Sequence, residues 1–151
     1  MAEGVLRAVL EERGLGHDIL LDSAATSGWE VGSAPDPRSI AVAVRHGVDI
    51  SGQKARKVTP QDFHRFDLIL GMDRSNVADL KALAPAAMRE RVQLFLEFAH
   101  GKAGDVPDPY YDGAEAFASV YRMIREASEV LATRLEARAS VPDSGQASST
   151  M

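Results

Sequence analysis

The sequence predicts an α/β protein with three layers, in which a small parallel sheet carries helices on both faces. Short apolar runs that are typical of buried strands alternate with helical patterns along the chain, as in sheets with crossover helices. The 151 residues, 45% hydrophobic and 26% charged, suffice for one domain with a core. We expect a single domain over residues 1–138, followed by a disordered tail over residues 139–151, which is rich in Ser and Gly.

The first half of the chain predicts three helices and one strand. Apolar residues spaced three and four apart predict an amphipathic helix over residues 1–13, with no capping residue before it. The apolar run 19–21 (Ile-Leu-Leu) predicts a buried strand. An Ala/Val-rich stretch predicts a short helix over 39–46. A Thr-Pro pair predicts another over 60–66, with proline at its first position.

The second half of the chain predicts a strand, a long helix and two shorter elements. Residues 67–72 (DLILGM) are typical of a buried strand, and the polar residues 73–76 are expected to cap a helix over 77–83. Residues 92–96 (VQLFL) fit either a third strand or a helix. Residues 114–138 predict the longest helix. Three strands are few for such a sheet.

Polar and acidic residues follow the predicted strands at the edge where parallel sheets bind ligands. Such folds hold ligands beyond the carboxyl ends of their strands. Those ends carry residues 22–24 (DSA) and 72–76 (MDRSN). The loop 105–111 (DVPDPYY) follows the third strand candidate and is close enough in sequence to reach the same edge.

Composition excludes several classes of function. The chain has no cysteine, which rules out disulfides and thiolate metal sites and fits a cytoplasmic protein. Its four histidines are scattered without metal-ligand spacing, and the net charge of −5 argues against a nucleic-acid partner. No apolar run has the length of a membrane span, and no basic, apolar leader opens the chain. We expect no metal, cofactor, nucleic-acid or membrane partner.

Five segments, in order along the chain, are similar to the low-molecular-weight protein tyrosine phosphatases. The acid loop DVPDPYY is one of them, and in another, Gln53 stands where many bacterial members have histidine. Each match is weak alone, but their common order makes the chain resemble this family up to about Leu135. The matching segments are residues 1–4, 22–29, 49–56, 67–76 and 105–111.

The resemblance implies the phosphotyrosine phosphatase I fold and a two-step phosphoryl transfer. In that family a cysteine thiolate attacks the phosphoester, and an aspartic acid protonates the leaving oxygen and later activates water. The cysteine lies in a C-x5-R-[ST] loop directly before the first helix, whose N–H groups stabilise the dianion. This chain contains neither that loop nor the family's first strand, which lies in the middle of the sheet.

Without that central strand we expect a gap in the sheet between residues 19–21 and 68–70. Adjacent strands lie about 4.8 Å apart, so the gap would be about twice as wide. Each buried, unpaired backbone group along it costs on the order of 1–3 kcal/mol. We therefore expect the chain to be poorly folded.

The resemblance gives Asp108 the role of proton donor and general base. Pro107 and Pro109 flank it and restrict the loop, which lowers the entropy lost in positioning the acid. The alternative is an exposed turn, in which Asp-Pro pairs are common.

Other residues are placed near the pocket by the same resemblance. Trp29, Tyr110 and Tyr111 would contact an aromatic substrate; the alternatives are that they anchor the loop or pack on the long helix. Asp73, Ser23 and Arg56 would support the site. For Asp73 a helix cap is an alternative, and for Arg56 a surface salt bridge.

The absent nucleophile leaves three interpretations of function. The first is a protein tyrosine phosphatase, acting on phosphotyrosine proteins or small aryl phosphates, whose recorded start falls after the phosphate loop; this chain itself would then be inactive. The second is a truncated, non-catalytic binding protein. The third is an arsenate reductase of the same fold, which would need redox cysteines.

Overall fold

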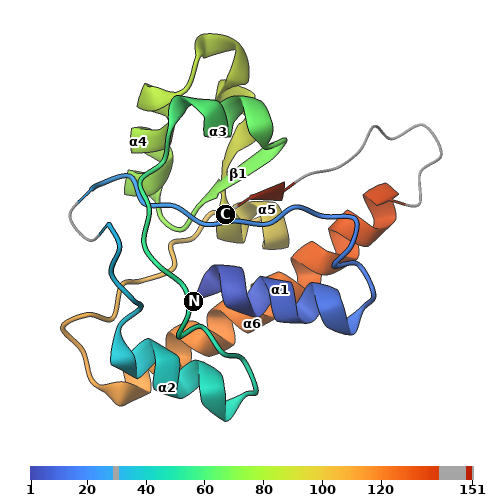
Figure 1. Cartoon of the computed structure of the whole chain (residues 1–151). Coiled ribbons are helices and arrows are strands. Elements are labelled where there is room, and N and C mark those ends of the chain that lie inside the picture. Colours follow the sequence, from blue (N-terminus) through green and yellow to red (C-terminus); the bar gives the residue numbers. More distant parts are fainter. Residues whose placement is uncertain (29–30, 140–148, 151) are drawn as a thin grey trace.

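A computed structural model describes residues 1–28, 31–139 and 149–150, and its centre is a small parallel sheet (Figure 1). The strands are β1 (Leu68–Gly71), β2 (Val92–Leu94) and β3 (Ser149–Thr150), in the order β2-β1-β3. Ile69 lies opposite Val92 on one side of β1, and Leu68 lies opposite Ser149 on the other. The strand predicted over residues 67–72 is confirmed and corresponds to β1.

Six α-helices and one 3₁₀ turn surround the sheet in the described part of the chain. In Figure 1, α1 lies along the long helix α6, with α2 across their near end, and α3 and α4 lie beside β1. None of the described helices is long and apolar enough to cross a membrane. The elements are α1 (Ala2–Glu12), α2 (Pro37–Arg45), α3 (Pro60–Arg65), α4 (Arg74–Leu83), the 3₁₀ turn (Ala86–Arg91), α5 (Phe95–His100) and α6 (Ala114–Ala139).

Alternate residues of β1 face two different cores, which confirms the predicted three layers. Leu68 and Leu70 belong to the larger core, with apolar side chains of α1, α5 and α6. Ile69 points the other way, into a smaller core with Phe63 and Phe66. Successive side chains of a strand point to opposite faces, so a strand that is buried throughout needs a cover on each face.

Side-chain caps explain where two of the helices begin. Asp36 accepts a hydrogen bond from the Arg38 N–H (2.8 Å) and so starts α2, with proline at its first position. Asp73 accepts from the Asn76 N–H (2.7 Å) and starts α4. Helix α4 therefore begins three residues earlier than predicted, because only Asp73, and not the whole segment 73–76, lies outside the helix.

Residues 92–96 combine the two structures that the sequence left open. Val92–Leu94 form β2, and α5 begins directly afterwards at Phe95. The alternation of buried Val92, exposed Gln93 and buried Leu94 is that of a strand. Phe95 and Leu96 are then both buried, as the core-facing side of a helix requires.

The strand predicted over residues 19–21 is wrong. This segment has no regular secondary structure and forms no ladder among the described residues; the nearby isolated bridge joins Ala25 to Lys57. Leu21 is buried, whereas Leu20 is 44% exposed. The Leu21 carbonyl accepts a hydrogen bond from the Arg7 guanidinium (2.9 Å), so a side chain supplies the partner that a neighbouring strand would have given.

The structure also corrects the expected gap beside β1 and part of the predicted tail. Ser149 and Thr150 form β3 and pair in parallel with Leu68 and Ile69, so β1 has a neighbour on each side. Unpaired strand edges are costly, and a nearby extended segment removes part of that cost. Of the segment 139–151 that was predicted to be disordered, residues 140–148 and 151 lie outside the described residues, and Ala139 ends α6.

Close packing of α4 against the end of β1 makes Gly71 sensitive to substitution. A Cβ at Gly71 would lie 2.7 Å from Val77 Cγ2 and 3.0 Å from the Val77 backbone nitrogen. We expect Gly71→Ala to lower the free energy of unfolding by about 1–3 kcal/mol. Urea denaturation measures this. Gly52→Ala is the matched control, because a Cβ there meets no atom within 4 Å; equal stabilities of the two variants would contradict the packing.

Candidate active site

A cleft of about 520 Å³ opens at the carboxyl end of β1. Its walls include the first residues of α1, the segment 23–27, the end of β1 with Met72 and Asp73, and the acid loop around Asp108. This is the edge at which parallel α/β sheets bind ligands. Within the described residues no side chain caps the first turn of α1, so the helix N-terminus faces the cleft with free N–H groups.

The acid loop is fastened to the end of β1 and the start of α4. The Val106 N–H donates to the Met72 carbonyl (2.8 Å), directly after β1. The Asp105 carboxylate accepts from the Arg74 N–H (3.0 Å) at the first turn of α4. Asp108 lies beyond these anchors on the wall of the cleft, where its Oδ1 accepts from the Tyr110 N–H (3.1 Å). The predicted proton donor, Asp108, and the end of the predicted strand, β1, therefore line the same cleft.

The two tyrosines of the acid loop do not line the cleft. Tyr110 is 54% exposed and Tyr111 95% exposed, and neither is among the residues that line it. Their rings contact each other edge to face, with centroids 5.0 Å apart. Tyr111 thus does not pack on the long helix, and both rings stand beside the acid on the same loop. Trp29 lies outside the described residues. The substrate-binding role of these residues stays a prediction.

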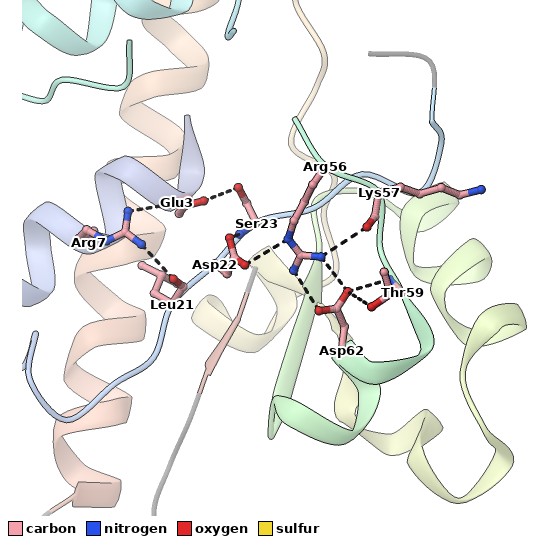
Figure 2. Close-up of polar contacts among 9 residues, drawn as sticks. All are labelled: Glu3, Arg7, Leu21, Asp22, Ser23, Arg56, Lys57, Thr59 and Asp62. Atoms are coloured by element: carbon pink, nitrogen blue, oxygen red, sulfur yellow. Dashed lines mark hydrogen bonds and ion pairs between the residues drawn. The ribbon is translucent and has the colours of Figure 1, made fainter. Parts of the chain in front are cut away.

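Ser23 is held by a charged pair at the start of α1 (Figure 2). Its hydroxyl donates to Glu3 Oε1 (2.5 Å), and the other Glu3 oxygen is paired with Arg7 (2.6 Å). Glu3 lines the cleft and was missed by the sequence analysis. An acidic residue in the first turn of an uncapped helix is the signal that could have found it, since such a position favours negative charge.

Arg56 joins two carboxylates on the opposite wall (Figure 2). Its Nε lies 3.1 Å from Asp22, and its Nη1 and Nη2 each lie 3.0 Å from an oxygen of Asp62. Asp62 also accepts from the Thr59 N–H (2.7 Å), which fixes the start of α3. Both alternatives for Arg56 hold in part: it forms salt bridges and it lines the cleft.

The environment of Asp62 lowers its pKa. Burial alone would raise the pKa of this carboxyl, but hydrogen bonds from Arg56 and from the Thr59 N–H, with the guanidinium charge, outweigh burial. A carboxyl whose folded pKa lies below its unfolded value stabilises the protein above the unfolded pKa. That contribution is lost as the pH falls through the folded pKa.

We expect Asp62→Asn to lower the free energy of unfolding by about 1–3 kcal/mol at pH 7, because it removes a charged partner from Arg56. The difference from the wild type should shrink as the pH falls below about 4, because the carboxyl of the unfolded chain takes up its proton there while the folded carboxyl does so only at lower pH. Urea unfolding between pH 7 and pH 3 measures it, with the exposed Asp79→Asn as control. A difference that stays constant to pH 3 would contradict the assignment.

The cleft carries more negative than positive side-chain charge. Of the described residues that line it, Arg56 is cationic and is already bound by Asp22 and Asp62. The carboxylates that line it are Glu3, Asp62, Asp73 and Asp108. A phosphate dianion therefore meets the N–H groups of α1 but no uncommitted cationic side chain of the lining. Asp73 both caps α4 and reaches the cleft, so its two interpretations are compatible.

Comparison with known proteins shows which family this chain is similar to. The sequence model of the low molecular weight phosphotyrosine protein phosphatases matches residues 1–141. A low molecular weight protein-tyrosine-phosphatase of Streptomyces coelicolor is 39% identical over 132 residues, 85% of this chain and 80% of the relative. The corresponding pig phosphatase is 36% identical over 124 residues, 81% of this chain and 78% of that protein.

Solved structures agree with the sequence comparison. A crystal structure of a protein tyrosine phosphatase from Entamoeba histolytica, with Hepes in its active site, superimposes with a TM-score of 0.84 at 31% identity. The match covers 90% of this chain and 87% of that one. Fold and site thus define an α/β protein of the phosphatase class. The chain belongs to the low molecular weight phosphotyrosine protein phosphatase family.

Proposed function

We propose that this chain provides the proton donor and the substrate-facing walls of a phosphomonoester hydrolase that works through a cysteinyl phosphate. The observation that carries the proposal is the meeting of Asp108 with the N-terminus of α1 in one cleft. A phosphoryl group placed at that N-terminus would be stabilised by N–H groups and the helix dipole. Asp108 lines the same cleft, which supports its role as the acid for the leaving oxygen.

The chemistry assigned to Asp108 has two steps. A thiolate attacks phosphorus, the P–O bond to the leaving group breaks, and the Asp108 carboxyl gives its proton to that oxygen. Asp108, now a carboxylate, then takes a proton from water as the water attacks the cysteinyl phosphate. The S–P bond breaks, phosphate leaves and the thiolate returns. Asp108 is protonated again at the end of the cycle.

By itself, this chain is proposed to be inactive. It has no cysteine, and a hydroxyl needs an activating base to act as nucleophile. Among the hydroxyl groups of the described residues that line the cleft, only that of Ser23 donates a hydrogen bond to a carboxylate. Its acceptor is the carboxylate of Glu3. The Glu3 carboxylate is already ion-paired with Arg7. The excess of carboxylates in the cleft also argues against the non-catalytic phosphotyrosine-binding interpretation.

We propose phosphotyrosine proteins and small aryl phosphates as substrates, in the cytoplasm. Tyr110 and Tyr111 stand on the acid loop with their rings exposed, where they can contact a flat aromatic leaving group. An arsenate reductase would need redox cysteines, which the chain does not contain.

A chimera tests the proposal. A segment with the family's first strand and C-x5-R-[ST] loop would be joined ahead of Met1. We expect the chimera to hydrolyse p-nitrophenyl phosphate and to lose this activity when the supplied cysteine becomes serine. A chimera that folds, as judged by a cooperative thermal transition, yet shows no turnover would contradict the proposal.

A further inference from the structure

Arg38, in the first turn of α2, connects the far half of the acid loop to the body of the protein. Its Nη2 donates to the Tyr110 carbonyl (2.8 Å), and its Nη1 donates to the Asp112 carbonyl (3.0 Å). Asp36 holds the guanidinium from the other side, with Nε 3.1 Å and Nη2 2.9 Å from its oxygens. The Arg38 guanidinium thus bridges one side chain and two backbone carbonyls from distant parts of the sequence.

Aromatic contacts fix the plane of the same guanidinium. Its central carbon lies 4.4 Å from the ring centroid of Phe117, a buried residue of α6, and 5.7 Å from that of Tyr110. A planar cation that stacks on a ring and donates from several N–H groups is a task for arginine rather than lysine. The pKa of Asp36 is lowered, chiefly by the hydrogen bond from the Arg38 side chain, which agrees with a formed ion pair.

We propose that Arg38 is a positioning residue for the acid loop: it holds residues 110–112 so that Asp108 stays on the wall of the cleft. The near half of the loop has its own anchors, since Val106 bonds to Met72 and Asp105 bonds to Arg74. Asp108 lies between these anchors and the carbonyls that Arg38 binds. Because Asp108 Oδ1 also accepts from the Tyr110 N–H, fixing Tyr110 restrains the acid itself.

This inference rests on the proposed function, because Arg38 would affect catalysis only through the position of Asp108. Arg38 itself is not among the residues that line the cleft. It would therefore act on the orientation of the acid and not on the binding of phosphate. Loss of Arg38 should lower kcat more than it raises KM.

Hydrogen exchange on the chain as it stands provides the test. The amides to follow are those of Tyr110, which donates to Asp108, and Asp112, which donates to the Pro109 carbonyl (2.8 Å). In Arg38→Ala we expect both to exchange about tenfold faster relative to the amides of β1, which report global stability. Arg38→Lys should give a smaller increase, since an ammonium cannot serve both carbonyls and the ring. Arg45→Ala, at the other end of α2, is the control.

Two outcomes would overturn the inference. One is that the Tyr110 and Asp112 amides exchange at the wild-type rate in both Arg38 variants. The other is an equal acceleration at loop and core, which would make Arg38 a general stabiliser. The exchange measurements do not depend on catalysis, so the inference can hold even if the proposed activity is absent. In the active chimera of the preceding subsection, an equal kcat for wild type and Arg38→Ala would contradict the role of the loop while leaving the hydrolase assignment intact.

Discussion

Purified as its sequence stands, the chain is expected to hydrolyse p-nitrophenyl phosphate no faster than buffer. The proposed reaction starts with a cysteine thiolate, and the chain has no cysteine. The cleft adds a second obstacle, because Arg56, the cationic side chain of its described lining, is already bound by Asp22 and Asp62. Nucleophile and phosphate clamp are thus both missing from the described residues, and the acid alone cannot replace them.

Two variants make this prediction sharp. Ser23→Ala removes the hydroxyl that donates to Glu3, and Asp108→Ala removes the proposed acid. Neither should change a rate that is already at background. Turnover that survives stringent purification and falls in Ser23→Ala would contradict the prediction and would identify Ser23 as a nucleophile activated by Glu3.

In the active chimera, Asp108→Asn is expected to reduce kcat for phenyl phosphate by about 10²–10⁴-fold, the usual contribution of a positioned general acid. Asparagine keeps a similar shape but cannot give a proton to the leaving oxygen. KM should change little, since Asp108 is not proposed to hold the phosphate. Steady-state kinetics measures both constants.

Other acids of the same loop serve as controls for Asp108. Asp105 is bound by the Arg74 N–H and its guanidinium, and we expect Asp105→Asn to alter kcat far less than Asp108→Asn. Asp112 contributes its backbone carbonyl to Arg38, so Asp112→Asn should be nearly silent. If Asp105→Asn gave the larger loss, the acid role would pass to Asp105.

Most of the fold follows from local patterns in the sequence. The periodic segments at residues 1–13 and 114–138 became α1 and α6 within one or two residues at each end, because an amphipathic face settles a helix strongly. Asp36 and Asp73 mark the starts of α2 and α4 through their own side chains. The strand 67–72 was clear since both of its faces are apolar and buried.

The misses share a physical reason: strand pairing is not a local property. The run 19–21 looks like a strand, but its carbonyl at Leu21 is satisfied by Arg7 from α1. Ser149–Thr150 have no apolar pattern, yet they pair with β1. Apolar runs can be identified in the sequence, but the tertiary structure determines which of them pairs with another strand.

The acid loop of the site could be predicted from the sequence, but the residues that hold this loop in place could not. Asp108 stands out by its two prolines and tyrosines. The bonds from Arg38 to the loop join residues more than 70 positions apart and go to backbone carbonyls, which leave no residue-type signal. The bond of Ser23 to Glu3 joins two side chains 20 positions apart, and no local pattern pairs them.

The dependence of kcat on the leaving group tests the role of Asp108 most directly. A series of aryl phosphates with leaving-group pKa values from activated to poor would be hydrolysed by the chimera and by its Asp108→Asn variant. With the acid present, log kcat should depend only weakly on leaving-group pKa, because the departing oxygen is protonated. In Asp108→Asn the dependence should become steep, with the greatest loss for the poorest leaving groups. Two parallel lines with a small, equal offset would show that Asp108 shapes the loop and is not the proton donor.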